Sequence, residues 1–178
     1  MNNQKSNHTM LLVQAAMIAA LYVVLTYIAN AMGLASSAIQ IRFSEALTIL
    51  PYFTPAAIPG LFVGCFLSNI LTGCAIPDII FGSIATLIGA LFTGRLRKQR
   101  MSGSASHPYV SKWLTPVPPI LANTLIVPFV LLYAYGIRPL WLSFITVGIG
   151  EIISCGVLGM LLLIMLEKYR GNLFSGQY

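Results

Sequence analysis

Long apolar segments alternate with short polar or turn-forming segments along the whole chain. A helix that crosses the hydrocarbon core of a bilayer needs about 20 predominantly apolar residues. On that basis the sequence predicts six transmembrane helices, at about residues 10–32, 39–53, 56–71, 77–93, 114–133 and 140–166. The second segment is short and nearly ends at Pro51, so whether it spans the bilayer fully stays open. The turn-like stretches PYFTPAAIPG and LTGCAIPD follow the second and third segments.

Two polar stretches frame this pattern. The N-terminal MNNQKSNHTM precedes an apolar run that is long enough to span and has no convincing cleavage site, so we interpret it as a retained first helix rather than a signal peptide. The basic, Gly/Ser-rich stretch GRLRKQRMSGSASHPYVSK predicts a loop over residues 94–113. Residues 1–178 are expected to form a single membrane domain.

The composition supports a membrane protein. The chain is 57% hydrophobic and 8% charged, with a mean hydropathy of +0.85, whereas soluble domains carry about 25% charged residues. Too few charges are present to cover a water-facing surface, which indicates an all-α, multi-pass protein of the cell membrane. The three cysteines lie in apolar runs without CxxC or Cys/His spacing, so neither a metal site nor a disulfide framework is expected.

The basic residues predict the orientation of the chain. With both termini in the cytoplasm, eight of the 10 Lys and Arg residues fall on the inner side, and only Arg42 and Arg138 lie outside. This distribution obeys the positive-inside rule. The net charge of +6 is therefore attributed to cytoplasmic segments rather than to nucleic-acid binding.

Polar side chains inside the apolar segments are the candidate functional residues. A charge at the bilayer centre costs about 2.5–3.5 kcal/mol on insertion scales, so such residues usually face the bundle or a cavity. The candidates are Arg42, Glu45, Asn69, Asp78, Asn123 and Glu151. Together they predict a polar cavity that opens outward.

Each candidate also has a purely structural interpretation. Arg42 and Glu45 are three residues apart on one helix face and can pair with each other. Asp78 can offset the dipole of its helix, and the two asparagines can hydrogen-bond neighbouring helices. Glu151, roughly 16 Å along its helix from Leu140, can be held by a neighbouring hydroxyl group or be protonated.

Motifs for independent catalysis are absent from the sequence. There is no GxxxxGK[ST] phosphate loop, no HExxH and no GxSxG. No cofactor is expected, and transport of a solute would need an ion gradient or an ATPase partner.

Small residues four apart indicate close helix contacts. Gly60 and Gly64 form a GxxxG pair, and the first helix carries two overlapping AxxxA pairs made by Ala15, Ala16, Ala19 and Ala20. Such spacing lets another helix approach closely, inside this chain or in a partner.

Several blocks resemble a known family. QAAMIAALYVVLT, with its AxxxA pairs, is similar to the first helix of substrate-binding S components of energy-coupling factor (ECF) transporters, which are six-helix membrane proteins of about this size. The blocks containing RFSEALT, PDIIFGSIATLIGA and VGIGEIISC resemble the QueT-type family, assigned to uptake of queuosine precursors. The resemblance covers about residues 11–168.

The resemblance implies a mechanism and partners. An S component binds its solute from outside, docks on a membrane T subunit served by two cytosolic ATPases, and releases the solute inside. The four alanines would form the docking face. The implied ligands are 7-deazaguanines such as preQ1, preQ0 or queuine.

The resemblance also implies ligand contacts, with alternatives left open. Glu151 or Glu45 would accept the N–H groups of the guanine-like edge, and Asp78 or the remaining glutamate would meet a cationic amine. Asn69 and Asn123 would contact other ring atoms, and Arg42 would contact the ring carbonyl or hold Glu45. A stacking aromatic is expected, supplied by Tyr27, Phe43 or Trp141.

Three rival hypotheses remain at this stage. The chain can be an S component for another vitamin, such as thiamine, riboflavin or biotin. It can be a membrane-embedded enzyme that uses Glu151 and Asp78 as acid and base. It can also be an assembly subunit whose polar residues only join helices.

Overall fold

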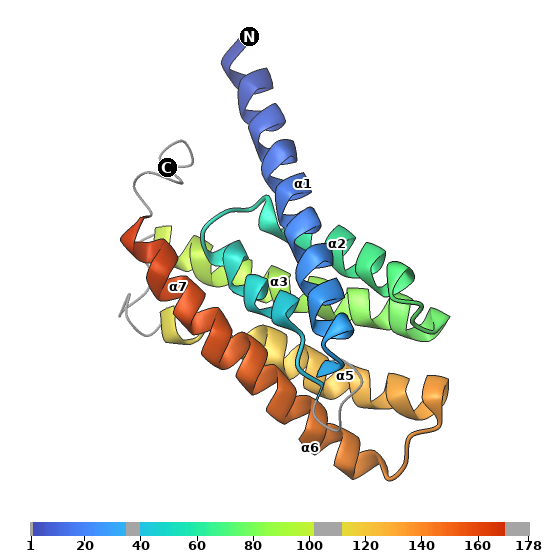
Figure 1. Ribbon diagram of the computed structural model, residues 1–178. Coiled ribbons are helices and arrows are strands. Elements are labelled where there is room, and N and C mark those ends of the chain that lie inside the picture. The colour runs from blue at the N-terminus through green and yellow to red at the C-terminus, as the bar shows by residue number, and fades with distance from the viewer. Residues whose placement is uncertain (1, 35–39, 102–111, 170–178) are drawn as a thin grey trace.

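The computed structural model describes residues 2–34, 40–101 and 112–169, and these form a helical bundle without β-strands (Figure 1). The helical elements, in chain order, are α1 (Asn2–Ala31), η2 (Phe43–Tyr52), α2 (Ala57–Leu71), α3 (Ile76–Met101), α5 (Val117–Tyr135), α6 (Leu140–Glu151), η3 (Ile152–Leu158) and α7 (Gly159–Lys168). The last three follow one another without a break, so the described chain has the six helical segments that the sequence predicts.

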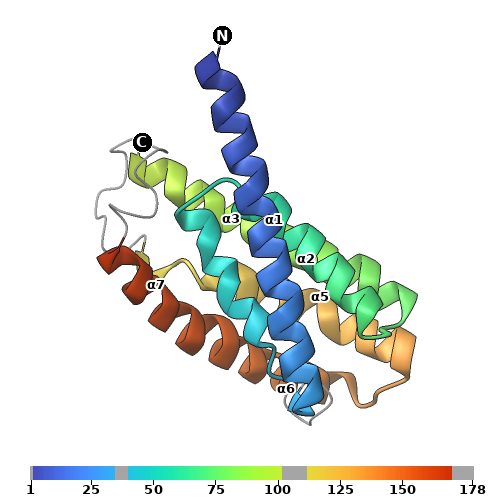
Figure 2. The same cartoon turned by 45° about the horizontal axis from the view of Figure 1, so that its top comes forward.

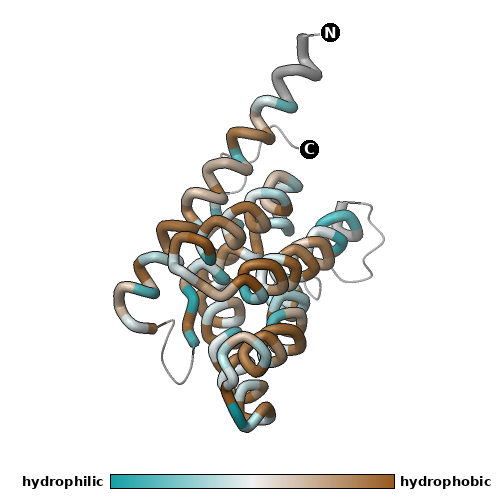
Figure 3. Tube along the Cα trace, turned by 90° about the vertical axis from the view of Figure 1, so that its right-hand side faces the viewer, coloured by the Kyte–Doolittle hydropathy of each residue, from teal (hydrophilic) through white to brown (hydrophobic). Residues whose placement is uncertain are grey.

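Four of these segments are long and apolar enough to cross a membrane: 8–31, 76–98, 117–135 and 140–168. Hydrophobic residues run along most of the helices in Figure 3. Large apolar side chains such as Leu12, Ile76 and Met165 lie exposed on the outside of the bundle. A solvent of lipid, and not of water, accounts for such a surface, so the protein is a multi-pass membrane protein.

The second predicted helix differs from the expectation of a transmembrane helix over 39–53. It is a 3₁₀ helix of ten residues, Phe43–Tyr52, and every residue from Ser44 to Tyr52 is buried. At about 2.0 Å per residue, ten residues cover about 20 Å, too little for the hydrocarbon core. This segment packs against α1, α3, η3 and α7, so it fills the bundle interior.

The predicted ends of two helices are also corrected. α3 continues to Met101, so residues 94–101 are helical and not part of a loop. The reason is local: Arg, Leu, Lys, Gln and Met are strong helix formers, and no proline interrupts them. Residues 102–111 of the predicted loop lie outside the described residues, and 112–113 are helical. α1 starts at Asn2 rather than at residue 10, so the polar N-terminal turns are helical.

α1 and α2 are joined by small residues on both helices. A Cβ added at Gly60 would lie 2.7 Å from the carbonyl oxygen of Ala15, and one added at Gly64 would lie 2.7 Å from the Cβ of Tyr22 and 3.1 Å from the Cα of Ala19. The GxxxG pair of α2 therefore packs against the AxxxA face of α1. Figures 1 and 2 show α1 crossing the bundle obliquely, with its N-terminal turns projecting beyond it.

The two ends of the bundle differ in the polar contacts that join their helices. At the basic end, Lys112 Nζ forms a 2.7 Å ion pair with Glu167 Oε2, which places the start of α5 beside the end of α7. At the opposite end, the hydroxyl group of Tyr135 accepts a hydrogen bond from the Ala75 N–H, 3.0 Å away, beside the turn between α2 and α3. Which end faces the cytoplasm stays a prediction from the charges.

Candidate functional site

Glu45 lies at the centre of the polar interior. It stands in the first turn of η2 and is 2% exposed. Its Oε1 accepts a hydrogen bond from the Tyr22 hydroxyl of α1, and its Oε2 accepts one from Asn123 Nδ2 of α5, 3.4 Å away. Three elements that are distant in the sequence thus converge on one buried carboxylate.

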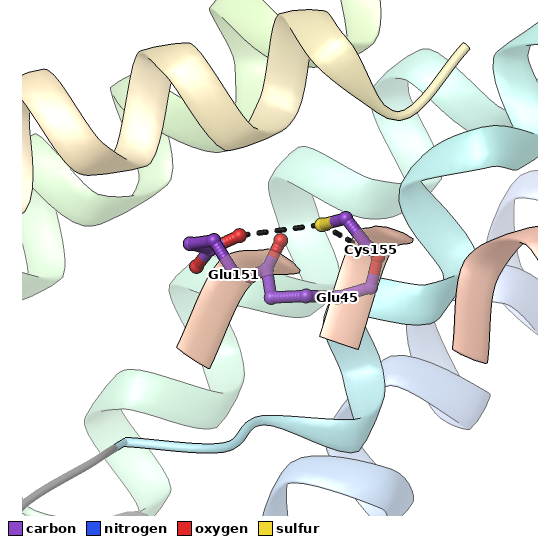
Figure 4. A group of neighbouring side chains, drawn as sticks. All are labelled: Glu45, Glu151 and Cys155. Carbon is purple, nitrogen blue, oxygen red and sulfur yellow. Dashed lines mark hydrogen bonds between the residues drawn. The ribbon is translucent and has the colours of Figure 1, made fainter. Parts of the chain in front are cut away.

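Glu151 and Cys155 complete the inner cluster (Figure 4). The Cys155 sulfur lies 3.2 Å from Glu151 Oε2 and 3.4 Å from the Glu45 backbone carbonyl oxygen, and its single S–H can donate to either acceptor. One ligand atom from each of Glu45, Glu151 and Cys155 lies within 4.8 Å of the other two. These atoms could hold a cation, but the Glu45 oxygens and the thiol already take part in hydrogen bonds, and we assign no metal here.

The helix that carries Glu151 changes its winding directly after it. Residues Ile152–Leu158 form a π-helical segment between α6 and α7. Such segments are frequent at functional sites because the extra residue redirects side chains and frees backbone groups. Here Ser154 Oγ accepts the Arg42 N–H at 3.2 Å, which ties the start of η2 to this segment.

A glycine lets the chain before η2 pass close to α6. A Cβ on Gly150 would overlap the carbonyl oxygen of Gln40. Any larger residue at 150 must therefore displace the backbone that leads to Arg42 and Glu45. The position is required for the site geometry, although no functional atom belongs to it.

Arg42 pairs with Asp78 and not, within the described residues, with Glu45. Its Nη2 lies 3.8 Å from Asp78 Oδ2, and Tyr135 donates a 3.3 Å hydrogen bond to the same oxygen. The interpretation in which Arg42 and Glu45 pair with each other is thus wrong. Arg42 precedes the 3₁₀ helix with an extended backbone, and its side chain reaches Asp78 of α3, whereas Glu45 reaches α1 and α5.

Asn69 joins α2 to the start of α3. Its Nδ2 donates to the backbone carbonyl of Asp78 at 3.4 Å and contacts the Cys65 sulfur at 3.7 Å. These contacts fit the structural role of an asparagine between helices.

Two cavities border these groups. The larger, which we call the outer chamber, has a volume of about 370 Å³, and Asn69, Asp78 and Tyr135 are among its lining residues. The smaller, the inner pocket, has about 10 Å³ and is bordered by Glu45, Asn123 and Glu151. Gln40 and Arg42 line both, so they separate the two spaces.

All six predicted site residues therefore lie on one of the two cavities, and Arg42 lies on both. The expected stacking aromatics do not join them: Tyr27 and Trp141 are more than 60% exposed, and neither they nor Phe43 line either cavity. Sequence reasoning missed Tyr22 and Tyr135. The signal for Tyr22 was a hydroxyl-bearing pair, Tyr22 and Thr26, spaced four residues apart on an apolar helix.

The four alanines of the AxxxA pairs differ in exposure. Ala19 is buried against α2, and Ala15 is half-buried there, whereas Ala16 and Ala20 are exposed. Ala15, Ala16 and Ala19 also line an apolar groove of about 530 Å³ between α1 and the start of α2. Docking of a partner on this face stays a prediction.

Comparison with known proteins identifies the family. The model of the QueT transporter family matches residues 12–168. The chain is 34% identical over 84 residues to a protein of Lactococcus lactis subsp. cremoris (strain MG1363) named queuosine precursor transporter QueT. That alignment covers 47% of this chain and 49% of the relative, so the chain spans about half the length of the curated relative it matches. No solved structure matches the chain. The chain belongs to the QueT transporter family.

Proposed function

From its membership of the QueT transporter family, we propose that this chain is the substrate-binding S component of an ECF transporter that imports a queuosine precursor, a 7-deazaguanine such as preQ1, preQ0 or queuine. The match to the family model over residues 12–168 supports a transporter. The name of the partial relative supports the ligand class.

The observation that carries the proposal is the juxtaposition of the outer chamber and the buried polar cluster. About 370 Å³ falls within the usual size range for small-molecule sites. A guanine-like edge presents adjacent N–H donors, and a carboxylate can accept two of them side by side. Glu45 and Glu151 supply such carboxylates at the floor of the site.

Binding at that floor requires the two cavities to join. The inner pocket has room for about one water molecule, which is too little for a bicyclic base. Arg42 separates it from the outer chamber, and its 3.8 Å pair with Asp78 is long for an ion pair. We infer that the Arg42 side chain shifts when the ligand enters, so that the base edge reaches Glu45 and Glu151.

Partners supply the energy in this proposal. The sequence has no phosphate loop, so ATP hydrolysis belongs to two ATPase subunits acting through a membrane T subunit. The exposed Ala16 and Ala20, next to the apolar groove at Pro55 and Pro59, support docking of that subunit on α1 and α2.

The rival enzyme hypothesis gains nothing from the geometry. Its acid and base, Glu151 and Asp78, border different cavities, with Arg42 between them. Among the described residues, no one cavity is lined by both groups, and no observation favours bond cleavage over binding.

Calorimetric titration of the purified protein in detergent tests the proposal. Aminomethyl, nitrile and queuine deazaguanines are the probes, with thiamine and riboflavin as controls. We expect binding of at least one deazaguanine, weakened by Glu45→Gln or Glu151→Gln and unchanged by Glu167→Gln, because Glu167 pairs with Lys112 at the far end of the bundle. Folded protein that binds thiamine or riboflavin but no deazaguanine would contradict the ligand assignment.

A further inference from the structure

Asp78 has one acceptor that no group in the described structure uses. The residue is 3% exposed, and its Oδ1 is buried without a hydrogen-bond partner among the described residues. A buried carboxylate oxygen without a partner costs free energy, and native structures leave few of them. Asp78 lines the outer chamber, so a donor group carried by a ligand is the candidate partner for this oxygen.

The polar neighbours of Asp78 bind atoms other than Oδ1. Tyr135 and Arg42 both approach Oδ2, at 3.3 Å and 3.8 Å. Asn69 directs its Nδ2 to the Asp78 backbone carbonyl. Oδ1 itself lies beside Gly82, since a Cβ there would be 3.3 Å from it, and Gly82 borders the inner pocket. Oδ1 thus lies beside a residue of the inner pocket, while Asp78 itself lines the outer chamber.

The carboxyl groups around the two cavities differ in the donors that reach their oxygens. The lining residues include three carboxylates, Glu45, Asp78 and Glu151, but one cationic side chain, Arg42. Glu45 is satisfied by the neutral donors Tyr22 and Asn123. The Asp78 carboxylate has a buried oxygen without a donor among the described residues, and a cationic N–H donor on a ligand would satisfy it with a charge-assisted hydrogen bond.

We propose that Asp78 Oδ1 accepts a hydrogen bond from a protonated primary amine of the ligand, so that the site selects amine-bearing over neutral deazaguanines. This inference rests on the proposed function. It deepens it by assigning the amine to Asp78, while the base edge is left to the two glutamates. Tyr135 then acts as a positioning residue, because its hydroxyl group donates to Oδ2 and leaves Oδ1 without a donor among the described residues.

A comparison of two ligands in two proteins tests the inference. The probes are the aminomethyl and nitrile deazaguanines, which share the base and differ in the charged group. Hydrogen bonds to charged groups predict that the native protein binds the aminomethyl form about 10- to 100-fold more tightly. In Asp78→Asn we expect the ratio of the two affinities to fall to near unity, because the neutral amide loses the charge-assisted hydrogen bond to the amine. Glu167→Gln is the matched control and should keep the preference.

The possible outcomes separate the inference from the proposed function. Equal affinity of the native protein for the two forms would overturn the inference while leaving deazaguanine binding intact. A preference that survives in Asp78→Asn would also overturn it and move the amine to a glutamate. Absence of binding by the aminomethyl, nitrile and queuine forms would overturn the proposed function, and the inference with it. If Asp78→Asn fails to fold, the inference is still tested, because equal affinity of the native protein for the two forms is enough to refute it.

Discussion

At the scale of single residues, Glu45 is held inside the bundle by neutral donors. Tyr22 and Asn123 reach its two oxygens from different helices, while the nearby arginine turns to Asp78. Neutral donors can be displaced by a ligand more readily than a paired cation can, because no buried charge is left behind. This arrangement suits a carboxylate that must exchange partners.

Removal of the Tyr22 hydroxyl tests that arrangement. We expect Tyr22→Phe to lower the free energy of unfolding by about 1–3 kcal/mol, because a buried carboxylate oxygen loses its donor. The same change in a Glu45→Gln background should cost less, since the charge is gone. Chemical denaturation in detergent of all four proteins gives the coupling between the two residues. Additive effects would show that the hydroxyl does not stabilise Glu45.

At the scale of elements, the site depends on two irregular helices placed face to face. The 3₁₀ helix η2 carries Arg42 at its start and Glu45 in its first turn, and the π-helical η3 supplies Ser154 and Cys155. Gly150 allows the chain before η2 to lie against α6. Irregular winding here places backbone and side-chain polar groups toward the site instead of toward lipid.

Two glycine substitutions test this contact as a matched pair. Gly150→Ala should lower the free energy of unfolding by about 1–3 kcal/mol, because its Cβ overlaps the Gln40 carbonyl oxygen. Gly156→Ala, whose Cβ would meet nothing nearer than 3.7 Å, should be neutral or stabilising by up to about 1 kcal/mol. Thermal unfolding in detergent measures both. Equal effects would show that close passage over Gly150 is unimportant.

The α1 face offers a second comparison between elements. Ala16→Leu changes an exposed position and should weaken association with the T subunit while leaving the fold stable. Ala19→Leu should destabilise the protein itself, because Ala19 packs against Gly64. Co-purification with the T subunit, alongside unfolding measurements, separates the two effects. Unchanged association of Ala16→Leu would remove α1 from the docking face.

At the scale of the whole molecule, the charges predict that the end with Lys98 and Lys112 faces the cytoplasm and that Arg138 faces outward. This can be checked by cysteine labelling in intact cells in a Cys74→Ser background. Arg138→Cys should react with a membrane-impermeant maleimide, and Lys98→Cys should react only after permeabilisation. The reverse pattern would invert the proposed direction of transport.

Much of the molecule was predictable from the sequence, for physical reasons. Apolar length predicts the spanning helices, and the cost of charge in lipid correctly directs Arg42, Asp78 and Glu151 to cavities. The 3₁₀ winding of η2 was not predictable, because a short buried apolar segment has the same hydrophobic pattern in an α-helix and in a 3₁₀ helix. The Arg42–Asp78 pair was missed for a related reason: it joins side chains 36 positions apart, which depends on packing and not on local spacing.

The most direct test of the whole account is uptake into proteoliposomes. Vesicles would hold the purified chain with or without an ECF module. Accumulation of labelled aminomethyl deazaguanine would be followed with and without ATP on the side of the membrane that carries the ATPase subunits. We predict accumulation only when the chain, the module and ATP are all present, and its loss in Glu45→Gln but not in Glu167→Gln. Accumulation by the chain alone, or equal accumulation by vesicles that lack the chain, would contradict its role as the substrate-binding subunit.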